Sequence, residues 1–226
     1  ALSVARATSL DADLIAYLES LSARAYFFVY GVRESAGRRL LRFLRRDWPA
    51  AVRNLLPETW VSLALLVAGT IIGAVLVTRD PSWYASFVPQ ELASGRDPSA
   101  STESLRRTLY DGDGQPLLLL ASFLFTNNAK VAILAFALGF AAGVPTALLM
   151  LSTGGMLGAF LVLFQMHGLL VPLIGWLMIH GTTELFAVVL AGAAGFRIAR
   201  AVVFPGALSR TAAVQAAGRQ AAVVMT

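Results

Sequence analysis

The feature that most constrains this chain is an apolar stretch, residues 172–195, which carries a histidine and an acid near its middle. About 20 apolar residues in an α-helix cross the hydrocarbon core of a bilayer, which is about 30 Å thick. His180 and Glu184 are four residues apart and share one helical face, with Thr183 beside them. An ionisable group at that depth costs several kcal/mol unless it is paired or faces a polar cavity. The pair is therefore either a functional site or a polar contact that fixes helix packing.

Composition narrows the class of protein further. Of the 226 residues, 57% are hydrophobic and 14% are charged, and the apolar residues come in long runs, which indicates an integral membrane protein. The absence of cysteine excludes disulfides, thiolate metal sites and a cysteine nucleophile. The net charge of +5 comes from arginines that flank the apolar runs, with Lys130 the only lysine. This pattern favours a positive cytoplasmic side over nucleic-acid binding.

The apolar runs predict an all-α, polytopic helical membrane protein with about four spans. We place the spans at about residues 60–77, 130–151, 155–170 and 172–196, within a transmembrane domain over residues 59–210. Residues 211–226 have the composition of the start of a further membrane segment. The sequence opens without methionine and closes inside an apolar run, so we expect a longer natural protein.

Residues 1–58 predict a cytoplasmic helical region that includes a basic amphipathic helix. Leucines at helical spacing indicate helix within residues 1–30, and an arginine-rich stretch follows. Its basic residues alternate with leucines and aromatic residues and comprise Arg38, Arg39, Arg42, Arg45 and Arg46. Such a helix either binds anionic headgroups in the membrane interface or forms a solvated face on a cytoplasmic helix. Both interpretations mark the cytoplasmic side, and the first makes the lipid bilayer a partner.

The longest polar segment, residues 78–116, is net acidic, so we expect it outside the cytoplasm. A loop of this length is usually functional or disordered, and we favour a small ordered cap that could contact a partner. The apolar run at 117–125 that follows is too short to cross a bilayer. We interpret residues 117–128 as a re-entrant or interfacial helix, and favour the re-entrant form, with Asn127 and Asn128 at its turn. An odd number of crossings between residues 117 and 196 then returns the chain to the cytoplasm, and three spans satisfy this.

Small residues recur at a spacing of four along the predicted spans, which is typical of faces where helices approach closely. The pairs are Gly69 and Gly73, Gly139 and Gly143, Gly154 and Gly158, and Ala191 and Gly195. These faces could pack within one chain or across a homodimer.

Two stretches resemble the stage II sporulation protein M family of bacterial membrane proteins over roughly residues 30–226. They are FLFTNNAKVAILAFALGFAAGVPTALLMLSTGGMLG at 123–158 and HGTTELFAVVLAGAAGFRIAR at 180–200. The resemblance rests on an Asn-Asn pair before a glycine-rich span, and on a His-Gly-x-x-Glu helix followed by Ala-Gly-x-x-Gly. It singles out Asn127, Asn128, His180, Gly181, Glu184, Gly192 and Gly195, and we add Gly181 and Gly192 to the packing residues. It implies a multi-pass protein of the bacterial plasma membrane. The founding member anchors a peptidoglycan-degrading machine whose hydrolases are separate proteins, whereas this arginine-rich chain resembles the branch found in bacteria that need not sporulate.

Three functions fit these features. The first is a non-enzymatic membrane scaffold without cofactor or metal, whose partners are other membrane or envelope proteins. Its helices would be held together by an intramembrane polar cluster of His180, Thr183, Glu184, Asn127, Asn128 and Lys130. The second is a transporter or channel for a small solute, ion or lipid that uses His180 and Glu184. The third is an intramembrane zinc hydrolase, which we place last because catalytic zinc needs about three protein ligands and only His167 could add a second imidazole.

The environment of Glu184 separates these hypotheses. A scaffold predicts a dry contact between its carboxylate and a donor such as Lys130, His180 or an asparagine amide. A transporter predicts a water-accessible cavity that reaches Glu184 from one side. A hydrolase predicts that His167, His180 and Glu184 converge within metal-ligand distance. We favour the scaffold, with the transporter second.

Overall fold

The computed structural model describes residues 17–24, 26, 35–93, 95–110 and 115–225, without the side chains of 115–121, 123 and 180. The described residues are predominantly helical and contain no strand, which confirms the all-α prediction. The chain divides into two compact units, residues 1–45 and 46–226. Most of the predicted helical region within residues 1–30 lies outside the described residues, and residues 17–24 of it are helical.

The first unit carries four of the predicted membrane-surface arginines. Helix α3 (Ala36–Arg42) starts at Ser35, whose hydroxyl accepts a hydrogen bond from the backbone nitrogen of Arg38 at 3.4 Å, as is typical of an N-cap. A π-helical turn, η1 (Phe43–Asp47), follows it. The side chains of Arg38, Arg39, Arg42 and Arg45 are exposed in this unit, and that of Arg46 is exposed in the next.

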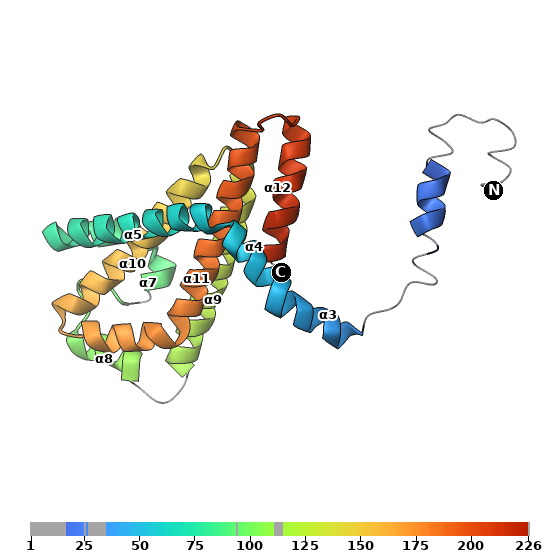
Figure 1. Cartoon of the computed structure of the whole chain (residues 1–226). Helices are drawn as coiled ribbons and strands as arrows, with labels where there is room; N and C mark the ends of the chain where they lie inside the picture. The colour runs from blue at the N-terminus through green and yellow to red at the C-terminus, as the bar shows by residue number, and fades with distance from the viewer. Residues whose placement is uncertain (1–16, 25, 27–34, 94, 111–114, 226) are drawn as a thin grey trace, which may run out of the picture. The chain divides into compact units, whose positions relative to one another are not determined.

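The second unit consists of long apolar helices, and the chain between the first and the second of these forms a set of short helices (Figure 1). Its elements are α4 (Trp48–Asn54), α5 (Leu56–Arg79), η2 (Pro81–Trp83), α6 (Tyr84–Phe87), α7 (Gln90–Ala93), α8 (Thr102–Tyr110), α9 (Gln115–Ala137), η3 (Leu138–Phe140), α10 (Val144–Met166), α11 (Leu170–Val203) and α12 (Arg210–Met225). The described residues include three helical segments long and apolar enough to cross a membrane, Leu56–Arg79, Val144–Met166 and Gly181–Val203. These helices support a location in a membrane.

The four long helices form two parallel pairs that run in opposite directions. In the pair α5 and α10, Leu66 lies beside Gly154 and Thr70 beside Gly158. In the pair α9 and α11, Asn128 lies beside Glu184 at one level and Ala135 beside Gly195 at another. Helices α5 and α11 are antiparallel, because Glu58 contacts Arg197 near the start of one and the end of the other. We refer to that level as the Arg197 end, and to the level of residues 81–110 as the cap end.

The helix boundaries between residues 115 and 170 differ from the prediction. We expected a re-entrant or interfacial helix over 117–128, then spans at 130–151 and 155–170, whereas α9 continues unbroken through Asn127 and Asn128, and α10 through residues 152–154. The chain turns instead at 138–143, where Ala142 and Gly143 adopt φ values of 57° and 77°. Glycine at 143 suits this left-handed backbone, while the glycines at 154 and 155 serve close helix contacts. The occurrence of a glycine in the sequence therefore does not by itself tell a turn from a helix-packing face.

Helix α12, expected as the start of a further membrane segment, packs along α11. Its buried side chains include Ala221, which joins Ala194 and Ile198 in one apolar cluster. Near its C-terminal end, Val224 packs with Leu55 and Leu190. Helix α12 is not among the segments that meet the length and hydropathy of a span, so that expectation stays a prediction.

Candidate functional site

The contact between α5 and α10 is made by backbone, and we call it the glycine interface. A methyl group added at Gly69 would overlap the carbonyl of Leu151, and one at Gly73 would overlap the backbone of Gly155. From the α10 side, Gly154 meets the Leu66 carbonyl and Gly158 meets the Thr70 carbonyl. These four glycines thus let two helix backbones touch, the arrangement that small residues permit between membrane helices.

The other predicted packing residues lie in different surroundings. Gly139 of η3 lies against the backbone of Gly195, Gly195 of α11 lies against the Ala135 carbonyl of α9, and Gly192 faces the Ser62 hydroxyl of α5. Ala191 is buried at 1% exposure within α11. Gly143 lies in the 138–143 turn instead of a helix interior, and Gly181 is buried against the side chain of Leu177 in its own helix.

The polar pair at the centre of the bundle is Asn128 and Glu184. The Asn128 amide Nδ2 donates a hydrogen bond of 2.6 Å to Glu184 Oε2, and both side chains are half-buried. Because α9 is continuous, Asn128 faces α11 from within a helix. The contact is one of the three that the scaffold hypothesis anticipated, an asparagine amide donating to the carboxylate.

No hydrogen bond joins this pair to the other members of the predicted polar cluster whose side chains are described, Asn127, Lys130 and Thr183. Asn127 is half-buried, whereas Lys130 and Thr183 are exposed. His180 is within α11, and its side chain lies outside the described residues. The structure therefore reduces the predicted cluster to one hydrogen-bonded pair among its described side chains.

A cavity of about 90 Å³ borders Glu184, and we call it the Glu184 cavity. Helices α9, α10 and α11 supply most of its wall, and residues 96, 108 and 109 close it at the cap end. The wall is mainly leucine, methionine and aromatic side chains, with Arg96, Thr108, Asn128, Thr153 and Glu184 as its charged and amide or hydroxyl groups. The cavity is partly open to the surface of the bundle. Glu184 thus has both a hydrogen bond to a neighbouring helix and an adjacent space.

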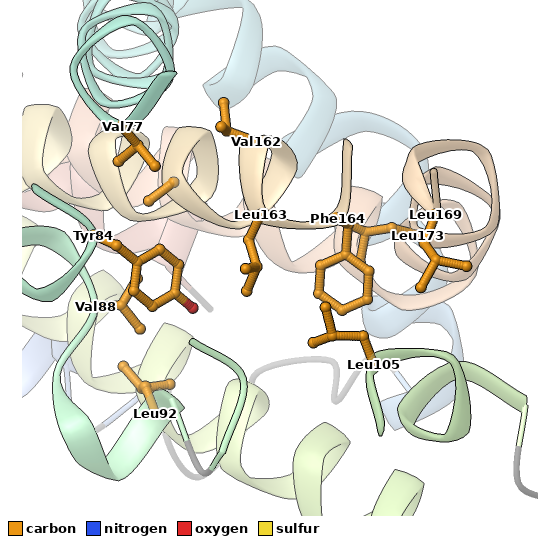
Figure 2. Packing of buried hydrophobic residues seen from close by; sticks show 11 residues of the cluster. Val77, Tyr84, Val88, Leu92, Leu105, Val162, Leu163, Phe164, Leu169 and Leu173 are labelled. Carbon is orange, nitrogen blue, oxygen red and sulfur yellow. The ribbon is translucent and has the colours of Figure 1, made fainter. Parts of the chain in front are cut away.

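Residues 81–93 and 95–110 form an ordered cap on α10 and the start of α11. Tyr84, Val88 and Leu92 are buried with Leu163 of α10, and Leu105 of α8 is fully buried (Figure 2). The Tyr84 ring meets the Phe160 ring edge-on, with 6.0 Å between centroids, and its hydroxyl donates to the Arg96 carbonyl at 2.6 Å. Burial raises the pKa of the Tyr84 hydroxyl and lowers the pKa of the Arg96 guanidinium. The cap therefore adds a second apolar core to the bundle.

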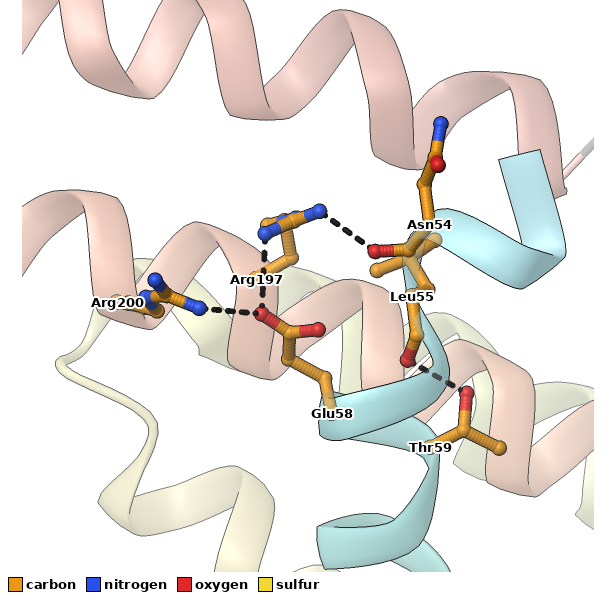
Figure 3. A network of polar contacts seen from close by, with 6 residues as sticks. All are labelled: Asn54, Leu55, Glu58, Thr59, Arg197 and Arg200. Atoms are coloured by element: carbon orange, nitrogen blue, oxygen red, sulfur yellow. Dashed lines mark hydrogen bonds and ion pairs between the residues drawn. The ribbon is translucent and has the colours of Figure 1, made fainter. Parts of the chain in front are cut away.

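A buried acid at the Arg197 end was missed by the sequence analysis. The Glu58 carboxylate pairs with Arg197 at 3.2 Å and with Arg200 at 3.4 Å, although its side chain is only 7% exposed (Figure 3). Arg197 also donates to the Asn54 carbonyl at 2.7 Å. An acid just before an apolar run, in an otherwise arginine-rich segment, was the available signal. The ion pairs of Glu58 thus connect the start of α5 to the end of α11.

The described residues contain no group of three histidine, cysteine, aspartate or glutamate side chains that could hold a metal ion. His167 is half-buried at the end of α10, where its Nδ1 lies 2.9 Å from the Leu163 carbonyl. That contact is with the backbone of its own helix and gives the imidazole a structural partner.

Comparison with known proteins identifies the family. No curated protein and no solved structure matches the chain. The family model for stage II sporulation protein M matches residues 62–226, which is most of the chain and includes both the glycine interface and the Asn128–Glu184 pair. The chain therefore belongs to the stage II sporulation protein M family.

Proposed function

We propose that this protein is a non-enzymatic scaffold in the bacterial plasma membrane that anchors other membrane or envelope proteins, with a role in envelope or peptidoglycan remodelling. We infer four crossings, by α5, α9, α10 and α11, with the N-terminal region and the Arg197 end in the cytoplasm and the cap outside. The arginines at 197 and 200, together with those before α5, support this orientation through the positive-inside rule.

The observation that carries the proposal is the Asn128–Glu184 hydrogen bond. An acid inside a helical bundle that is bound by a neutral amide from a neighbouring helix fixes how the two helices pack. Together with the glycine interface and the ordered cap, it gives a framework with a fixed shape on which partners can assemble. No cofactor or nucleic acid has a part in this proposal.

Three surfaces suit partners of different kinds. The exposed arginines of residues 38–46 suit anionic headgroups of the bilayer. Helix α5 exposes apolar side chains such as Trp60, Val67 and Ile71, which suit lipid, a partner helix or a second copy of this chain. The cap exposes Trp83, which suits a partner protein outside the cytoplasm.

Two substitutions test whether Glu184 acts as a structural contact. Glu184→Gln keeps a carbonyl acceptor for the Asn128 amide, so we expect thermal stability in detergent and cellular phenotype close to wild type. Glu184→Ala removes the acceptor and leaves a cavity, and we expect a loss of about 2 kcal/mol. If Glu184→Gln abolishes function while the fold is intact, the carboxylate is needed as a charge and the scaffold proposal fails. If Glu184→Ala changes neither stability nor phenotype, the contact has no structural role.

A transporter or channel is the second candidate, and the Glu184 cavity is the observation that favours it. Single cysteines along 177–191, labelled from each side of the membrane, distinguish the two functions, because the chain has no native cysteine. A scaffold predicts that the positions facing Asn128 resist water-soluble reagents. Labelling of that face from one side of the membrane would favour the transporter over the scaffold.

A further inference from the structure

The Glu184 cavity combines apolar walls with a guanidinium, that of Arg96, which forms no ion pair with a described carboxylate. Arg96 Nη2 donates to the Leu92 carbonyl at 2.9 Å, while Arg96 Nε is buried without a hydrogen-bond partner in the described part of the chain. The adjacent Asp97 carboxylate is engaged elsewhere, since it accepts from the Ser99 backbone nitrogen at 2.8 Å and from the Ser99 hydroxyl. Arg96 therefore has donor capacity and positive charge left for a ligand.

A partly buried guanidinium without a counter-ion is unfavourable, because burial removes water that would stabilise its charge. An anion beside it would offset this cost. Arginine is suited to a phosphate or carboxylate, because its planar group offers several N–H donors in a fixed fork. The Arg96 guanidinium thus favours an anionic group at the cap end of the cavity.

The rest of the wall specifies a hydrocarbon. The side chains of Leu124, Met156, Phe160 and Leu177 leave about 90 Å³ of space, the liquid volume of about three waters. The apolar part of this wall favours an apolar group over water. A short segment of an alkyl chain fits such a volume, and the open side of the cavity lets the remainder of the chain continue outside.

We propose that the Glu184 cavity binds one anionic phospholipid, with its phosphodiester at Arg96 and part of an acyl chain between α9, α10 and α11. The position of Arg96 in the cap, beyond the ends of the spans, is the level at which headgroups lie. Glu184 lines the same cavity, so its charge disfavours free phosphate, a dianion, more than a singly charged phosphodiester. This inference is independent of the scaffold proposal, because a bound lipid is compatible with a scaffold and with a transporter.

The test uses the full chain, purified in detergent and delipidated. Native mass spectrometry and thermal unfolding are measured with phosphatidylglycerol, with phosphatidylethanolamine, and with glycerol 1-phosphate, which has the headgroup chemistry without the chains. We expect one phosphatidylglycerol per chain and a rise in the unfolding temperature with lipid concentration. Equal binding of phosphatidylethanolamine would overturn the assignment to an anionic lipid. Equal stabilisation by glycerol 1-phosphate would assign the site to a small anion instead.

Matched variants locate the lipid. Arg96→Gln should weaken phosphatidylglycerol binding about tenfold or more, because a charge-assisted hydrogen bond is lost. Arg107→Gln is the control, since Arg107 is 65% exposed in the same cap, pairs with Glu103 and does not line the cavity. Equal effects of the two variants would overturn the proposal.

A second variant covers the case in which Arg96→Gln fails to fold. Leu177→Phe fills the cavity from α11 and leaves every charge in place, and we expect it to reduce lipid retention as well. Unchanged phosphatidylglycerol binding in folded Leu177→Phe would show that the chain lies elsewhere and would overturn the proposal on its own.

Discussion

Helix α10 has two faces that are built in opposite ways. On the glycine interface, Gly154 and Gly158 bring its backbone against that of α5. Toward the Glu184 cavity, Thr153, Met156 and Phe160 leave space between helices. A contact between backbones cannot adjust by side-chain rotation, whereas a cavity lined by leucine and methionine can. The difference teaches that one helix can fix the frame of the bundle and still leave room for a ligand.

The largest effect should come from breaking the glycine interface. Gly158→Leu inserts a side chain where the Thr70 carbonyl lies, so we expect a loss of more than about 3 kcal/mol and little folded protein. The measurement is the yield and thermal stability of the purified protein in detergent. Gly175→Leu is the control, because nothing lies within 4 Å of a methyl group added at Gly175. Similar losses in both variants would contradict the contrast between the two faces.

A second prediction compares the buried acid Glu58 with Glu184, which borders a cavity. Glu58→Ala leaves Arg197, whose side chain is 22% exposed, without its carboxylate, so we expect a loss of about 3 kcal/mol. That loss should exceed the effect of Glu184→Ala, whose partner is a neutral amide beside a cavity. The control Glu103→Ala removes an exposed ion pair with Arg107 and should cost less than about 1 kcal/mol. Thermal unfolding of the three variants checks the order, which an equal loss in Glu58→Ala and Glu103→Ala would refute.

The smallest predicted effect is a pH dependence in the cap above the Glu184 cavity. Burial raises the pKa of Tyr84 above its ordinary value of 10.0, so folding favours the neutral hydroxyl. This contribution is complete below pH 10 and is lost as the pH rises, by up to about 1.4 kcal/mol per pH unit. Thermal unfolding from pH 8 to 11 should therefore fall more steeply above pH 10 for wild type than for Tyr84→Phe. Parallel curves would mean that water reaches the hydroxyl.

The sequence was sufficient for the class of protein and for several positions in the bundle. Hydropathy and length identified α5 and most of α11, because about 20 apolar residues admit few other structures. The spacing of His180 and Glu184 indicated the helix that carries the central acid. The asparagine amide was among the donors considered for it, and Asn128 occupies that role.

Two features were beyond sequence patterns for physical reasons. We predicted breaks near residues 126–128 and 152–154, whereas the chain turns at 138–143. Asparagine is tolerated inside a membrane helix once a neighbouring helix satisfies its amide. Glu58 was overlooked because an acid near a membrane boundary can equally be solvated. Its pairing with Arg197 depends on a contact between residues 139 positions apart.

The hydrogen bond from the Trp48 indole to the Val224 carbonyl, 3.4 Å long, joins residues 176 positions apart. At about 5–20 residues per second, a ribosome needs roughly 10 to 35 s to make that length of chain. Helix α4 is therefore synthesised long before α12 exists to cover Trp48, Ala51 and Val52. During that interval the apolar side chains of α4 remain uncovered by α12. The docking of α12 is one of the last events in the biosynthesis of this part of the fold.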